Sequence, residues 1–219
     1  MPAHRLDPLL RPRSVAVVGA SERPGSPGNE AIVNLLRGGY RGELFLVNPS
    51  RQFVDGIACY SDLEALPKTP EHVVFAVSDQ RVEALLEQAI SLGVKAATLF
   101  SALQLADDES PSLKQRVQAL ANSAGLLLHG ANCMGLFNFL DGVLLSGFDT
   151  REHRRLGSVA LLSQSGAGMS GIVDCEERLG FCFAASTGQE LCVSLEDYLD
   201  YVLDLPETKV VGLFLETSR

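Results

Sequence analysis

The chain has 219 residues, of which 46% are apolar and 21% are charged. This length and composition suffice for the buried core of one large domain, or of about one and a half ordinary ones. The formal net charge of −9 argues against a nucleic-acid partner, because phosphate backbones need a basic surface, but it leaves open an anionic cofactor held by backbone N–H groups.

In the first part of the chain, short apolar runs alternate with longer amphipathic segments, which is the pattern of βαβ units. The predicted strands are 14–19, 44–47, 73–77, 96–100 and 126–129. The predicted helices are 28–37, 79–92 and one that begins at Ser110-Pro111 and ends near Gly125. This order predicts an α/β fold with a doubly wound parallel sheet for a first domain at residues 1–149.

A charged stretch at 150–157 is interpreted as a connector, and a second α/β series follows it. Its predicted strands are 158–163, 183–185 and 210–216, and its predicted helices are 166–179 and 191–203. Three strands are few for a domain of this class, so we expect residues 150–219 to be part of an incomplete second domain.

The first strand leads into a turn with glycines at positions 19, 25 and 28, directly before a helix. Backbone N–H groups and the helix dipole converge there, which favours a phosphate-bearing cofactor over a merely glycine-tolerant loop. The spacing is not G-x-G-x-x-G, and Asn48-Pro49 stands where NAD enzymes usually carry an acid. An NAD-dependent oxidoreductase is therefore disfavoured.

Two further turns contain residues that could act in catalysis or bind an anion. In GANCMG (130–135), Cys133 is either a nucleophile or, as we favour, a small buried thiol. In SQSGAG (163–168), a hydroxyl-rich helix N-terminus fits an anion site, and Ser163 could also cap the helix. We expect the N–H groups of Gly166, Ala167 and Gly168 to point toward that site. We also expect the strand 159–162 to lie next to, or one strand away from, 210–215, so that Glu216 emerges at the same edge. None of the four histidines has metal-like spacing, so no metal site is predicted, and His129 beside GANCMG is more often structural than catalytic.

The compartment follows from what the sequence lacks. The first residues contain no apolar signal-peptide segment, and the most hydrophobic stretch, 126–148, is interrupted by Asn, Asp and Gly residues. The five cysteines form no CxxC pair. We therefore expect a cytoplasmic protein with no membrane partner and no nucleic-acid partner, while its oligomeric state, a homo-oligomer included, stays open.

Five segments in this order resemble the NDP-forming acyl-CoA synthetases, which include the ADP-forming acetyl-CoA synthetases and, more distantly, the α subunit of succinyl-CoA synthetase. The segments are SVAVVGASERPGSPGNEAIVNLLRGGYRGELFLVNP, VDGIACYSDLEALP, GANCMG, LLSQSGA and LPETKVVGLFLE. The resemblance implies a CoA-binding Rossmann-like domain followed by a flavodoxin-like ligase domain. It implies that phosphate passes between a nucleotide, a histidine and an acyl phosphate, before CoA attacks to give the thioester.

The resemblance also assigns residues by position. The CoA phosphate turn corresponds to Gly19, Ala20, Ser21, Gly25 and Gly28, and the pantetheine and adenine wall to Asn48 and Pro49. By the same resemblance, Ser78 and Ser101 are expected to line this cleft, and Asn132 and Cys133 to lie near the CoA thiol. Ser163, Ser165 and Gly166 correspond to the helix N-terminus that stabilises the phosphohistidine, and Glu216 to the acid that orients that histidine.

The chain departs from the family in two respects. Ser186-Thr187-Gly188-Gln189 stands where S-x-G-N is usual, and no histidine occupies the Ser-His-Thr-Gly-like segment expected beyond Glu216. We therefore expect ATP or ADP to act only through an ATP-grasp domain or subunit outside this chain, with a small carboxylic acid as the other substrate. The alternative from another class is a CoA-sensing regulatory module of a protein acetyltransferase.

Overall fold

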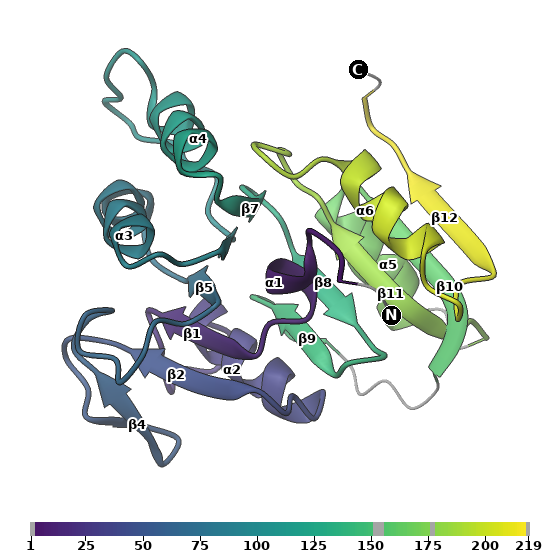
Figure 1. The fold of residues 1–219 in the computed structure, drawn as a ribbon, viewed down its shortest axis with the longest axis horizontal. Helices are drawn as coiled ribbons and strands as arrows, with labels where there is room; N and C mark the ends of the chain where they lie inside the picture. The colour runs from purple at the N-terminus through teal and green to yellow at the C-terminus, as the bar shows by residue number, and fades with distance from the viewer. Residues whose placement is uncertain (1–2, 151–155, 176–177, 218–219) are drawn as a thin grey trace.

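The computed structural model describes residues 3–150, 156–175 and 178–217, which form two β-sheets with helices on their faces (Figure 1). The first sheet has the order β3-β4-β2-β1-β5-β6-β7 and is parallel except for β3. Its strands are β1 (Ser14–Val18), β2 (Glu43–Val47), β3 (Phe53–Val54), β4 (Ile57–Tyr60), β5 (His72–Phe75), β6 (Ala96–Leu99) and β7 (Leu127–Gly130). The crossover helices are α2 (Pro27–Arg37), α3 (Asp79–Ser91) and α4 (Leu113–Ala124).

The second sheet has the order β12-β10-β11-β8-β9. The strands are β8 (Gly135–Asn138), β9 (Val143–Ser146), β10 (Leu156–Ser163), β11 (Phe181–Ser186) and β12 (Val210–Phe214). The helices are α5 (Gly166–Cys175) and α6 (Leu195–Leu203), and a short α1 (Asp7–Leu10) precedes β1. Figure 1 shows α5 and α6 on opposite faces of this sheet. The predicted α/β class, with a doubly wound parallel sheet and a second α/β unit, is confirmed.

The core lies in three layers because neighbouring strand residues point to opposite faces of a sheet. In β1, Ala16 and Val18 pack against α3 and α4, whereas Val15 and Val17 face the side of α2. The layer on the α2 side continues without a break to the face of the second sheet that α6 covers. A third layer lies between α5 and the other face of the second sheet. The two sheets therefore share one central core.

The β8–β9 hairpin links the two sheets. β8 pairs antiparallel with both β9 and β11, and α2 of the first sheet packs on β9. The buried Asn34 of α2 donates hydrogen bonds from Nδ2 to the carbonyl oxygens of Ser146 (3.2 Å) and Phe148 (2.8 Å). Residues 135–146 thus precede the predicted boundary at 149/150 but belong to the second sheet, and the division into two domains stays a prediction.

The hairpins β3–β4 and β8–β9 were not predicted from the sequence, and some helices begin at other residues than predicted. α4 begins after Ser112 rather than at Ser110-Pro111, because Ser112 and Gln115 form a reciprocal capping box. α6 begins at Leu195 rather than at 191, because the Asp197 carboxylate accepts a hydrogen bond from the Ser194 N–H (2.9 Å).

The predicted connector falls mostly on residues 151–155, which lie outside the described residues. Within the described parts, no helix combines the length and the apolar character that crossing a membrane requires.

Candidate functional site

The glycine-rich turn after β1 brings three segments of backbone into direct contact. Gly19 has φ +92°, and a Cβ atom at this position would lie 2.9 Å from the carbonyl carbon of Ala76, at the end of β5. A Cβ atom on Gly28 would lie 3.0 Å from the carbonyl carbon of Gly19. Both positions therefore require glycine, and the N-terminus of α2 sits directly on the end of β1.

Polar side chains hold this turn in place. Asn29 Nδ2 donates to the carbonyl oxygen of Ser21 (3.1 Å), and Asn48 Nδ2 donates to that of Ala20 (2.8 Å). The buried Glu30 accepts a hydrogen bond from the Gly25 N–H (2.8 Å). α2 begins at Pro27, capped by Ser26, one residue before the predicted start. Asn48 thus stabilises the turn, and the role of Asn48 and Pro49 as a cofactor wall stays a prediction.

The remaining residues assigned to CoA follow β5, β6 and β7. Because these strands are parallel neighbours of β1, Ser78, Ser101 and Asn132 come to the same carboxyl edge as Gly19. The Asn132 N–H donates to the carbonyl oxygen of Ser101 (2.8 Å). The Ser101 Oγ is buried and has no hydrogen-bond partner among the described residues. The structure therefore brings the predicted cofactor residues to one edge of the sheet, and their contacts with CoA stay a prediction.

Cys133 occupies the turn after β7 but points into the core. Its side chain is buried, and Sγ donates to the carbonyl oxygen of Leu99 (3.3 Å). Burial raises the pKa of this thiol to about 12, which favours the protonated form at neutral pH. His129, in β7, is buried against the Tyr198 hydroxyl (2.5 Å). Both side chains are thus buried, in agreement with a structural interpretation of each, and the place of Cys133 near the CoA thiol stays a prediction.

The second predicted turn joins β10 to α5. Ser163 Oγ accepts from the Ser165 N–H (3.1 Å) and donates to the Ser165 carbonyl (2.6 Å), so Ser163 shapes the turn and does not cap the helix. The cap is Ser165, whose Oγ accepts from the Gly168 N–H (3.2 Å). The expectation that the Gly168 N–H faces an anion is therefore wrong, and the N–H groups of Gly166 and Ala167 are the ones left for that role.

Glu216 emerges beside this turn. β10 and β12 pair in parallel, with Ser163 opposite Phe214, so the predicted adjacency of the two strands is confirmed. The Gln164 N–H donates to the carbonyl oxygen of Phe214 (3.0 Å), and Gln164 Oε1 accepts from the Glu216 N–H (2.9 Å). Ser165 and Glu216 thus share one edge of the second sheet, although the role of Glu216 toward a histidine stays a prediction.

The turns of the two sheets meet directly. The Gln189 N–H donates to the Ala131 carbonyl (2.8 Å), and the Met134 N–H donates to Ser186 Oγ (3.2 Å). Gly188 has φ +62°, and a Cβ atom there would lie 2.9 Å from the Asn132 carbonyl oxygen. The loop that departs from the S-x-G-N pattern therefore packs on GANCMG, and the two groups of predicted site residues adjoin.

Glu190 in this loop was not among the predicted site residues. Its side chain is 6% exposed and accepts a hydrogen bond from Thr187 Oγ1 (2.8 Å). The signal that could have found it is its isolation, since Glu190 is the sole charged residue between 179 and 195. A carboxylate in such an apolar stretch needs partners in the fold.

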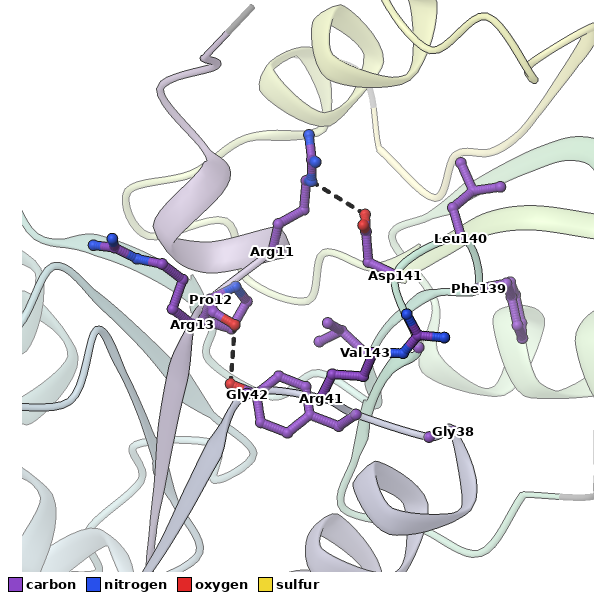
Figure 2. Close-up of a pocket in the computed structure, with 13 residues that line it drawn as sticks. Arg11, Pro12, Arg13, Gly38, Arg41, Gly42, Phe139, Leu140, Asp141 and Val143 are labelled. Carbon is purple, nitrogen blue, oxygen red and sulfur yellow. Dashed lines mark hydrogen bonds and ion pairs between the residues drawn. The ribbon is translucent and has the colours of Figure 1, made fainter. Parts of the chain in front are cut away.

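A cavity of about 630 Å³ lies elsewhere, at the amino ends of β1 and β2 (Figure 2). Arg11 on its rim pairs with Asp141 (3.1 Å), and Arg13 pairs with Glu71 and points away from the cavity. This cavity is at the opposite edge from the predicted cofactor turn, and its charges are largely paired. Within the described residues, no three His, Cys, Asp or Glu side chains gather as a metal site would require.

Comparison with known proteins agrees with this geometry. Residues 13–138 match the model of the CoA binding domain, and residues 156–219 match the succinyl-CoA ligase like flavodoxin domain. A trans-feruloyl-CoA synthase from an unknown prokaryotic organism is 30% identical over 98% of this chain and 31% of its own length. The α subunit of acetate–CoA ligase [ADP-forming] II of Pyrococcus furiosus is 29% identical over 96% of this chain and 46% of its own length.

Among solved structures, the apo form of an acetyl-coenzyme A synthetase 1 of Ca. Korarchaeum cryptofilum superposes with a TM-score of 0.88 at 26% identity. The match covers 98% of this chain and 46% of that one, so the chain spans less than half the length of these relatives. The resemblance to NDP-forming acyl-CoA synthetases is thereby confirmed, and the chain belongs to the CoA binding domain family.

Proposed function

We propose that this chain is the CoA-binding and partial ligase region of an NDP-forming acid–CoA ligase, which makes an acyl-CoA thioester from a small carboxylic acid. The observation that carries the proposal is the direct packing of the loop 186–190 on the turn 130–134. This packing joins the carboxyl edge of the first sheet, where CoA is proposed to bind, to the edge of the second sheet at which α5 begins. A thiol and an acyl phosphate must meet in such a reaction, and this junction is where the two edges adjoin.

The first sheet fits the phosphate end of CoA. Gly19 and Gly28 allow the N-terminus of α2 to approach the end of β1, and helix N-termini with exposed N–H groups bind phosphate. Such a site works in a chain of net charge −9, because the donors are backbone groups rather than basic side chains. The position of Asn48 supports CoA over NAD, since its amide is engaged with Ala20 and offers no carboxylate to a ribose.

The edge of the second sheet fits a site for the proposed phosphoryl transfer. The turn at Ser165 and Gly166 presents the N-terminus of α5, and Glu216 lies at the same edge. We infer that a phosphohistidine from outside this chain docks there and that an ATP-grasp domain or subunit supplies the nucleotide. Relatives named ADP-forming acetate–CoA ligases, some of them as separate α subunits, support this inference. No observation favours the regulatory alternative.

The proposed organisation has a CoA-binding domain at 1–149 and a ligase-domain portion at 150–219. Four described cysteines, Cys59, Cys133, Cys182 and Cys192, are free thiols, which supports a reducing, cytoplasmic setting.

Ligand binding to the purified chain tests the CoA assignment. CoA is expected to raise the melting temperature, because a ligand of the native state stabilises it by RT ln(1 + [L]/Kd). NAD at equal concentration is expected to do much less. Arg41→Ala, in the cavity at the opposite edge, is the control and should leave the response to CoA unchanged. Equal or larger stabilisation by NAD would refute the assignment.

A further inference from the structure

Glu190 and Gln164 join two loops of the candidate phosphoryl site that are distant in sequence. Glu190 is 6% exposed and has φ +51°, a left-handed backbone conformation that L-residues adopt at a cost in conformational free energy. Its Oε1 accepts hydrogen bonds from Thr187 Oγ1 (2.8 Å) and from Gln164 Nε2 (3.4 Å). The buried carboxylate thus faces the side chain that follows β10.

The amide of Gln164 has two chemically different ends, and each faces a matching partner. Its Oε1 accepts from the backbone N–H groups of Glu216 (2.9 Å) and Thr217 (3.0 Å). In the flipped orientation, the NH₂ group would face two N–H donors and the carbonyl oxygen would face a carboxylate. Glu190 therefore determines which end of Gln164 points to the segment after β12.

We propose that Glu190 is a positioning residue that acts through Gln164 to hold the backbone of Glu216. The relay from Glu190 through Gln164 to Glu216 fixes where the Glu216 carboxylate emerges at the edge of the second sheet. Its purpose rests on the proposed function, in which Glu216 orients the histidine that carries the phosphoryl group. The relay itself requires no ligand, so it can be measured on this chain alone.

Amide hydrogen exchange at Glu216 and Thr217 reports the relay directly, because Gln164 Oε1 is their acceptor. Glu190→Ala is expected to raise both exchange rates roughly tenfold, the order expected for loss of a hydrogen bond. Glu190→Gln keeps an acceptor for Thr187 and Gln164, so it should exchange like the native chain. The amides of Gln164 and Thr187, which bond to Phe214 and Ser163, are internal controls and should stay protected.

A double variant in which residues 164 and 190 swap their side chains separates the effect of the relay from an effect on general stability. Gln164→Glu alone brings two carboxylates together and should also expose the amides of Glu216 and Thr217. When it is combined with Glu190→Gln, the amide and the carboxylate trade places, and protection should return.

Unchanged exchange in Glu190→Ala would overturn the proposal, and so would an equal rise at the control amides, which would show general loosening. A double variant that exchanges as fast as Gln164→Glu would also overturn it. Failure of CoA to bind would refute the proposed function and leave this result standing.

Discussion

Gly28 lies against Gly19 so closely that a Cβ atom on Gly28 would stand 3.0 Å from the Gly19 carbonyl carbon and nearer still to its oxygen. This contact joins the end of β1 to the first turn of α2. The geometry of the candidate phosphate turn therefore depends on the absence of a Cβ atom at Gly28.

Gly28→Ala is therefore expected to destabilise the chain by about 1–3 kcal/mol, the usual range for overpacking, and to weaken CoA binding. Urea unfolding and calorimetric titration measure the two effects. Gly171→Ala is the matched control, because a Cβ atom there meets nothing within 4 Å in the helix α5. That substitution should stabilise by about 0.5–1 kcal/mol. Equal effects at both positions would contradict the packing argument.

Asn48→Asp tests whether the amide of Asn48 supports the same turn. The substitution removes the Nδ2 donor to the Ala20 carbonyl and places a carboxylate beside an acceptor. We expect a loss of about 1–3 kcal/mol in the free energy of unfolding and weaker binding of CoA, measured by thermal shift with and without the ligand. Asn122→Asp on the exposed side of α4 adds the same charge and should change CoA binding little. Unaltered CoA binding in Asn48→Asp would argue against this turn as the phosphate site.

Two buried histidines predict loss of stability in mild acid. Burial lowers the pKa of His72 to about 3 and that of His129 to about 4, whereas an unfolded histidine titrates near about 6.5. The unfolded state thus binds more protons below pH ~6.5, and stability falls as the pH drops from there toward the folded pKa values. Between pH 7 and pH 5, the free energy of unfolding is expected to fall by about 2 kcal/mol for each histidine.

Urea unfolding at several pH values measures this slope. His129→Gln should flatten it by about half, and His72→Gln should do likewise, because each removes one of the two protonation equilibria. A slope that is the same in the native chain and in both variants would show that other groups control acid unfolding.

Ser165→Ala tests the assignment of the cap of α5. Loss of the Oγ acceptor for the Gly168 N–H should cost about 1 kcal/mol, measured by chemical denaturation. Ser170→Ala in the same helix is the control, since Ser170 is partly exposed and, within the described residues, its hydroxyl donates only to the Ala167 carbonyl (3.4 Å). That change should be neutral or slightly stabilising, because alanine is the better helix former. The cap assignment is wrong if the two variants unfold alike.

Local pattern by itself determined much of this protein. The apolar run of β1 predicted a strand, which the structure buries on both faces, and the glycines at 19 and 28 predicted a strand–turn–helix connection. These features depend on neighbours within a few residues and on backbone sterics, so they can be read along the chain. The shared edge of Ser165 and Glu216 was also predictable, because parallel strands end at the same side of a sheet.

Only the tertiary structure decided what depends on partners far away in sequence. The hairpin β8–β9 follows the first series of strands but pairs with β11, because Phe137 and Leu144 find their apolar partners under α5. Cys133 became a buried, protonated thiol because its turn faces the core below Leu99. Glu190 acquired its place through Thr187 and Gln164, which no spacing reveals. Burial and hydrogen-bond partners are properties of packed surfaces, and those surfaces exist only after the distant segments have come together.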